Sequence, residues 1–81
     1  MKDAITIYLN EKDDKVYVKV PPNGPCHFSL QNLAGKILQE EVHEKELHDF
    51  DLTGLPDGIY FVIVNQNENI RSKKIVKGYH P

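Results

Sequence analysis

The chain has 81 residues, of which 40% are hydrophobic and 27% are charged, and its formal net charge at neutral pH is −2. This length allows one domain, and the composition is that of a folded globular protein. The charge balance argues against a dedicated nucleic-acid-binding protein. No apolar run reaches the roughly 20 residues of a membrane-spanning helix, and a single cysteine excludes an intramolecular disulfide.

Apolar and polar residues alternate with a period of two over the first third of the chain. Segments 5–9, 16–20 and 26–31 each carry apolar side chains at every second position, which predicts strands with one buried face. The polar segment 10–14 separates the first two as a turn. Segment 21–25 reads Pro-Pro-Asn-Gly-Pro, which cannot continue a strand, so a loop is predicted there.

The next segment has two interpretations. Gly35 suits the positive φ of a tight hairpin turn, and the residues that follow it, 36–42, are predicted to form a strand. These residues include few β-branched side chains and several glutamates, so a helix is the alternative. We favour the strand because the neighbouring segments are strands and because the segment is too short to form a stable helix alone.

Three more strands are predicted in the second half. In segment 47–52, His48, Phe50 and Leu52 share one face. Segment 59–64 is apolar on both faces, which is typical of a central strand covered on both sides, or on one side by a partner. Segment 70–77 is a basic strand that closes the fold.

The strongest turn signal lies between the fifth and sixth predicted strands. Pro56 presets the first corner of a β-turn, and Gly58 suits a left-handed backbone conformation. Seven short strands at intervals of about ten residues, with a turn signal between each pair, are typical of a sandwich. The sequence therefore predicts an all-β, seven-stranded immunoglobulin-like β-sandwich as a single domain over residues 1–81.

No catalytic or metal-binding pattern is present. Cys26 and His27 are adjacent in a predicted strand and point to opposite faces, so they do not form a nucleophilic pair, and Cys26 is predicted to lie in the core. The histidine spacings do not match those of structural zinc sites, and these residues are predicted to be surface or half-buried. We expect no enzyme activity, no metal and no cofactor. The histidines are His27, His43, His48 and His80.

Two clusters of charged residues could belong to a functional site or could simply form a charged surface. Asp49 and Asp51 share a strand face about 7 Å apart, but they lack the glycine-containing loop of a calcium site, so a solvated face is predicted. Lys73 and Lys77 share a face of the last strand, about 13 Å apart, with Ile75 between them. Lysines on an edge strand protect it against aggregation, and the same spacing also belongs to a family pattern.

Three features in a fixed order carry that pattern. Segment 51–62 begins with an acidic-Leu-x-x-Leu-x-x-Gly-x-Tyr sequence, a Gly-Lys turn at residues 35–36 precedes it, and a Lys-x-x-x-Lys strand at residues 73–77 follows it. In order and spacing, the chain from residue 26 to its end resembles the C-terminal sorting domains of the type IX (Por) secretion system of Bacteroidota. That family has a seven-stranded immunoglobulin-like sandwich, in agreement with the predicted strands.

The resemblance implies a sorting label. In the family, the domain ends a longer exported protein, the outer-membrane secretion machinery recognises it, and a sortase-like protease removes it. We therefore expect an N-terminal cargo domain, transit through the periplasm, and delivery to the cell surface or outside the cell. Residues 1–3 are not followed by the apolar stretch of a signal peptide, which agrees with such a position in a longer protein. The expected sorting-signal residues are Gly35, Gly58, Tyr60, Lys73 and Lys77.

Two other functions remain open. The first is a stand-alone small secreted or periplasmic immunoglobulin-like protein. The second is a carbohydrate-binding accessory domain, which needs exposed aromatic rings that stack on sugars. The candidates for such rings are Tyr8, Tyr17 and Tyr79, and they are not clustered in the sequence.

Overall fold

A computed structural model describes residues 4–78, which form seven strands and no helix. The predicted strand at residues 36–42 is confirmed, and the helix alternative for that segment is wrong. Tyr79 and His80 lie outside the described residues. The strands are β1 (Thr6–Asn10), β2 (Lys15–Lys19), β3 (Cys26–Asn32), β4 (Ile37–His43), β5 (Leu47–Asp51), β6 (Gly58–Gln66) and β7 (Asn69–Lys77).

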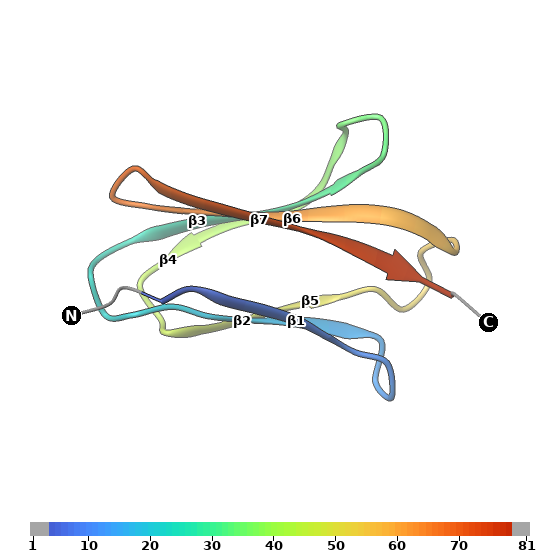
Figure 1. Cartoon of the computed structure of the whole chain (residues 1–81), viewed down its shortest axis with the longest axis horizontal. Helices are drawn as coiled ribbons and strands as arrows, with labels where there is room; N and C mark the ends of the chain where they lie inside the picture. Colours follow the sequence, from blue (N-terminus) through green and yellow to red (C-terminus); the bar gives the residue numbers. More distant parts are fainter. Residues whose placement is uncertain (1–3, 79–81) are drawn as a thin grey trace.

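The strands form two antiparallel sheets that lie face to face (Figure 1). One sheet has the order β1-β2-β5, and the other has the order β4-β3-β6-β7. The chain crosses from one sheet to the other between β2 and β3, between β4 and β5, and between β5 and β6. The arrangement confirms the predicted all-β sandwich, and an immunoglobulin-like fold is consistent with it.

The core is a single layer of side chains between the sheets. Alternate residues of β2, β3 and β6 point into it, as the period of two predicts. Phe28 and Phe50 are fully buried, and burying a side chain of that size contributes about 1.5–3 kcal/mol. Cys26 is 1% exposed, which confirms its predicted core position. The buried hydrophobic residues are Ile7, Val16, Val18, Val20, Cys26, Phe28, Leu30, Phe50, Leu52, Tyr60, Val62, Val64 and Ile75.

Strand β6 lies between β3 and β7, which confirms its predicted central place. Its inward side chains are buried. Its outward side chains, Ile59, Phe61 and Ile63, are half-buried between the neighbouring strands, and no third layer of the described chain covers them. A partner on this outer face stays a prediction.

At both lateral edges of the sandwich, a side chain from one sheet bonds to the backbone of the other sheet. On one side, Lys73 Nζ of β7 donates a hydrogen bond to the carbonyl oxygen of Ile7 in β1, at 3.0 Å. On the other side, Gln39 Nε2 of β4 donates to the carbonyl oxygen of Asp51 in β5, at 2.9 Å. These bonds join the edge strands of opposite sheets, which share no backbone ladder.

A buried amide holds the loop between β2 and β3. Gln66 is 3% exposed, and its Nε2 donates to the carbonyl oxygens of Pro21 and Gly24, at 2.9 and 3.2 Å. Because the proline-rich loop has few backbone donors of its own, this side chain supplies a donor to the Gly24 carbonyl and a second donor to the Pro21 carbonyl, which also accepts from the Asn23 N–H at 2.9 Å.

Replacing Gln66 by leucine keeps the side chain's bulk but leaves both loop carbonyls without this donor. We expect Gln66→Leu to lower the free energy of unfolding by about 1–3 kcal/mol in urea denaturation. The matched control is Asn65→Ala at the neighbouring exposed position, for which a change within about 0.5 kcal/mol is expected. Equal effects of the two substitutions would contradict this role of Gln66.

Candidate functional site

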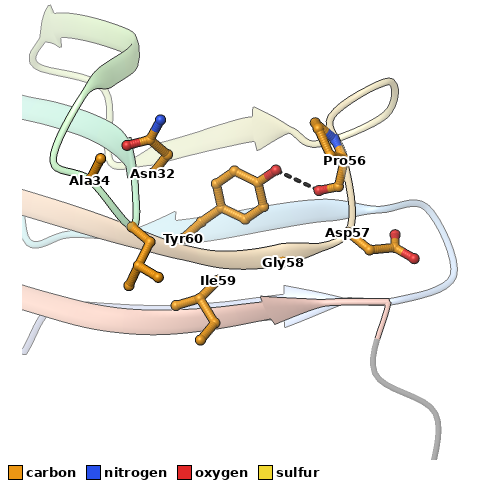
Figure 2. Close-up of a pocket in the computed structure, with 8 residues that line it drawn as sticks. Asn32, Ala34, Pro56, Asp57, Gly58, Ile59 and Tyr60 are labelled. Atoms are coloured by element: carbon orange, nitrogen blue, oxygen red, sulfur yellow. Dashed lines mark hydrogen bonds between the residues drawn. The ribbon is translucent and has the colours of Figure 1, made fainter.

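The segments that carry the sequence pattern meet at one end of the sandwich. The β3–β4 turn, the β5–β6 connection and the end of β7 all lie at the right-hand end of Figure 1. Between the turn and the connection is an open, mainly apolar hollow of about 360 Å³, drawn in Figure 2. Its lining residues are Asn32, Leu33, Ala34, Pro56, Asp57, Gly58, Ile59 and Tyr60.

The β3–β4 turn is held by Asn32. The Asn32 carbonyl accepts a hydrogen bond from the Gly35 N–H at 2.9 Å, and its side-chain Oδ1 accepts one from the Lys36 N–H at 2.9 Å. Gly35 has a φ of 89°, the left-handed conformation expected at the last position of a three-residue hairpin loop. The turn thereby holds Leu33 and Ala34 at its exposed tip, where Leu33 is 67% exposed.

Tyr60 holds the β5–β6 connection from the side of the core. The tyrosine is 5% exposed, and its ring is part of the core. Its hydroxyl donates a hydrogen bond to the Pro56 carbonyl at 2.5 Å, and Figure 2 shows the ring between Asn32 and Pro56. At the start of the connection, hydrogen bonds from Thr53, chiefly from its backbone N–H at 2.9 Å, lower the pKa of Asp51.

The end of β7 supports the same connection. Lys77 Nζ donates a hydrogen bond to the Leu55 carbonyl at 2.6 Å, and Lys77 pairs in register with Gly58. Gly78, with a φ of 80°, lies so close to the Asp57 side chain that an added Cβ would come within 2.2 Å of its Cγ. A side chain at position 78 would have to displace the exposed Asp57 side chain, and the positive φ of Gly78 adds backbone strain for any other residue.

Four of the five predicted residues gather at this end. Gly58, Tyr60 and Lys77 surround the β5–β6 connection, and Gly35 lies in the facing turn. Lys73 lies farther along β7, where it bonds to β1. Lys73 and Lys77 lie on the same face of β7 as the buried Ile75, as the spacing predicts. Each ammonium group donates to a backbone carbonyl, one in β1 and one in the β5–β6 connection.

Sequence reasoning missed the residues that form the exposed surface of the hollow. The sequence pattern does not point to Leu33 or Ala34 in the hollow, nor to Gly78 at the end of β7. A signal for Leu33 was available, because a large apolar residue in a turn between Asn32 and Gly35 is exposed by the turn itself. The role of Gly78 depends on the approach of Asp57 across the end of the sheet, which the sequence does not reveal.

Other titratable residues are dispersed. Within residues 4–78, no three histidine, cysteine, aspartate or glutamate side chains are arranged to hold a metal ion. Cys26 is buried, and this burial raises the pKa of its thiol, while His27 points outward and pairs with Glu40. His43 and His48 do meet, with 2.9 Å between His43 Nε2 and His48 Nδ1.

The comparison with protein families agrees with the geometry of this end. The family described as the secretion system C-terminal sorting domain matches residues 2–78, and the chain belongs to this family. It is therefore a sorting domain of type IX secretion, a class of non-catalytic domain that implies an N-terminal cargo, contact with the secretion machinery, and export to the cell surface or beyond. No curated protein gives a significant match. The described residues include no helix that is long and apolar enough to span a membrane.

Removing one hydroxyl tests the support of the β5–β6 connection. Tyr60→Phe keeps the buried ring but leaves the Pro56 carbonyl without its donor, so we expect the free energy of unfolding to fall by about 0.5–1.5 kcal/mol. Urea denaturation measures the change. Tyr8→Phe, on the exposed outer face of β1, is the control and should resemble the wild type. A Tyr60→Phe protein as stable as the wild type would argue against this support.

Proposed function

We propose that this domain directs an N-terminally attached cargo through the outer-membrane translocon of type IX secretion, and that a sortase-like protease then removes it. The cargo passes through the periplasm and ends at the cell surface or in the medium. The single observation that carries the proposal is the convergence of the family's pattern segments around one exposed hollow at one end of the sandwich.

The residues of the pattern have two kinds of role in this proposal. Gly58, Tyr60 and Lys77 shape and support the β5–β6 connection, Gly35 shapes the facing turn, and Lys73 fixes β7 against β1. The surface that the machinery contacts is formed by neighbouring residues of the hollow, chiefly Leu33, Ala34 and Ile59. An exposed apolar hollow with few polar groups is the kind of surface that binds an apolar side chain of a protein partner.

A secretion assay with surface variants tests the contact. Residues 2–81 are fused to an exported reporter in a host with the translocon, and reporter delivered to the surface without the domain is quantified. Leu33→Ser should reduce delivery severalfold while leaving the free energy of unfolding within about 0.5 kcal/mol of the wild type, because Leu33 is largely exposed. Ile70→Ser, at an equally apolar and 57% exposed position at the far end of β7, is the matched control.

Two further variants test the supporting residues. Gly58→Val forces a β-branched residue to a φ of 156°, and Lys77→Ala removes the bond to Leu55, so both should reduce delivery. If Leu33→Ser, Gly58→Val and Lys77→Ala all leave delivery unchanged, this end of the sandwich is not the recognised surface.

Carbohydrate binding is a second candidate function, because β1 and β2 bring together two aromatic residues that are distant in sequence. Tyr8 and Tyr17 are opposite each other in the register, and their stacked ring centroids are 5.5 Å apart. Tyr8 is 47% exposed. Tyr17 donates a hydrogen bond to Asp13 at 2.6 Å, and this bond raises the pKa of Tyr17 to about 12.

The surroundings of the two rings favour a sugar over an apolar partner. Lys15 and Asp49 lie on the same outer face and form an ion pair at 3.5 Å, with both side chains partly exposed. Such groups donate to and accept from vicinal hydroxyls, while a fixed tyrosine ring offers contact area at a low cost in conformational entropy.

An NMR titration tests this second candidate. Cellohexaose or laminarihexaose, added to 10 mM, should shift backbone resonances of β1 and β2, and Tyr8→Ala should weaken binding about tenfold, or about 1.4 kcal/mol. Lys12→Ala, in the β1–β2 turn, is the control. Absence of shifts with both sugars, or shifts unaffected by Tyr8→Ala, would remove the candidate.

A further inference from the structure

The corner between β4 and β5 is closed by two histidines from opposite sheets. His43 ends β4 in the four-stranded sheet, and His48 lies in β5 of the three-stranded sheet. Their rings are hydrogen-bonded, with 2.9 Å between His43 Nε2 and His48 Nδ1. At the end of the sandwich where β4 leads into β5, the two sheets are joined by the connecting residues 44–46 and by this hydrogen bond.

The neighbouring backbone determines which nitrogen carries each proton. The Lys45 N–H donates a hydrogen bond to His43 Nδ1 at 3.1 Å, so this nitrogen is an unprotonated acceptor. A neutral His43 then carries its proton on Nε2, which donates to His48 Nδ1. His48 Nδ1 is therefore also an acceptor, and its own proton is on Nε2. The chain of two hydrogen bonds exists only when both imidazoles are neutral.

Aromatic packing holds the pair in place. The ring of the fully buried Phe28 stacks on both His43 and His48, with each pair of ring centroids 4.6 Å apart. The His48 and Phe50 rings also meet edge to face, with their centroids 4.6 Å apart. Because the two histidines cover the face of a core phenylalanine, separating them exposes apolar surface at this corner.

Some groups around the pair lower the pKa of His48, and others raise it. Burial, and after it the proximity of His43, lower the pKa of His48, while Asp49 and Glu41 oppose this shift. Cys26 lies opposite His43 in the β3–β4 register, and burial raises the pKa of its thiol, so it stays neutral here. The exposed connection adds Glu44, Lys45 and Glu46, and Lys19 of β2 lies opposite Leu47, next to His48.

We propose that His43 and His48 form a proton-sensitive latch between the two sheets. The first proton taken up makes His43 Nδ1 a donor, which costs the bond from the Lys45 N–H but leaves one proton between the two rings. The second proton makes both facing ring nitrogens donors, so the bond between His43 and His48 is lost. A second positive charge beside the first adds repulsion across a half-buried contact. The latch is closed when both rings are neutral, and it opens in mild acid, which separates β4 from β5 and uncovers Phe28.

The direction of the pH effect follows from linkage. A lowered pKa in the closed form means that the open form binds more protons as the pH falls below about 6.5, the ordinary histidine value. The stability of the corner is therefore complete above that pH and decreases as the pH drops through it. For each additional proton bound, the opening equilibrium constant rises by at most about tenfold per pH unit in this range.

Hydrogen exchange at pH 7.5 and 5.5 tests the latch, after correction for the intrinsic chemical rates. Amides of β4 and β5 near the corner should open severalfold more often at pH 5.5, while amides of the β6–β7 hairpin should keep their protection. His48→Phe keeps an aromatic ring on Phe28 but removes one titrating group, and it should abolish most of this dependence. His27→Gln, which removes a histidine that faces outward, should retain the wild-type response.

A second measurement uses only the wild-type protein. Long-range ¹⁵N–¹H correlation of the imidazoles at pH 7.5 should show both His43 and His48 protonated on Nε2. A different tautomer in either ring overturns the proposal. It is also overturned if exchange at the corner does not change between the two pH values, if His48→Phe responds like the wild type, or if the acceleration is equal over all strands.

Discussion

The space between the two sheets is one layer of side chains thick, and the rest of the structure depends on this limit. In a chain of 81 residues, nearly every inward position of the central strands is needed for the apolar layer. The central strands bury only two polar side chains among the described residues, Ser29 and Gln66, while on the edge strands β4 and β7 long polar side chains reach across to the other sheet. Binding surfaces are accordingly left to the turns, the corners and the outer faces.

In the Lys-x-x-x-Lys pattern of β7, the two lysines support the surface at the end of the sandwich and do not form it themselves. A spacing of four residues in a strand places Lys73 and Lys77 on the inner side of β7, with Ile75 anchoring the strand between them. Each ammonium group satisfies a carbonyl of the opposite layer, one in β1 and one in the β5–β6 connection. Inward lysines also blunt an edge strand against pairing with other chains, so the edge-protecting and the supporting interpretations describe the same geometry.

The sequence predicts the strands well, and the exceptions have identifiable causes. The sequence leaves strand or helix open for β4, because none of its residues belongs to the buried core. Its strand conformation comes from pairing with β3. The five expected sorting-signal residues follow from turn chemistry and from the family pattern, which are local in sequence. The contacts between His43 and His48, and between Tyr8 and Tyr17, depend on sheet packing and hairpin register, which side-chain periodicity does not fix.

The two ends of β4 connect the hollow with the histidine corner. The strand begins beside the β3–β4 turn and ends at His43, and along its outer edge it is tied to the other sheet by Gln39 and by His43. The Gln39 bond is made by an amide, which does not titrate, and it lies nearer the hollow. Loss of the histidine contact therefore separates only the far end of β4 from β5, because β4 remains paired with β3 and Gln39 still binds Asp51. The β3–β4 turn that lines the hollow thus keeps its position when the corner is protonated.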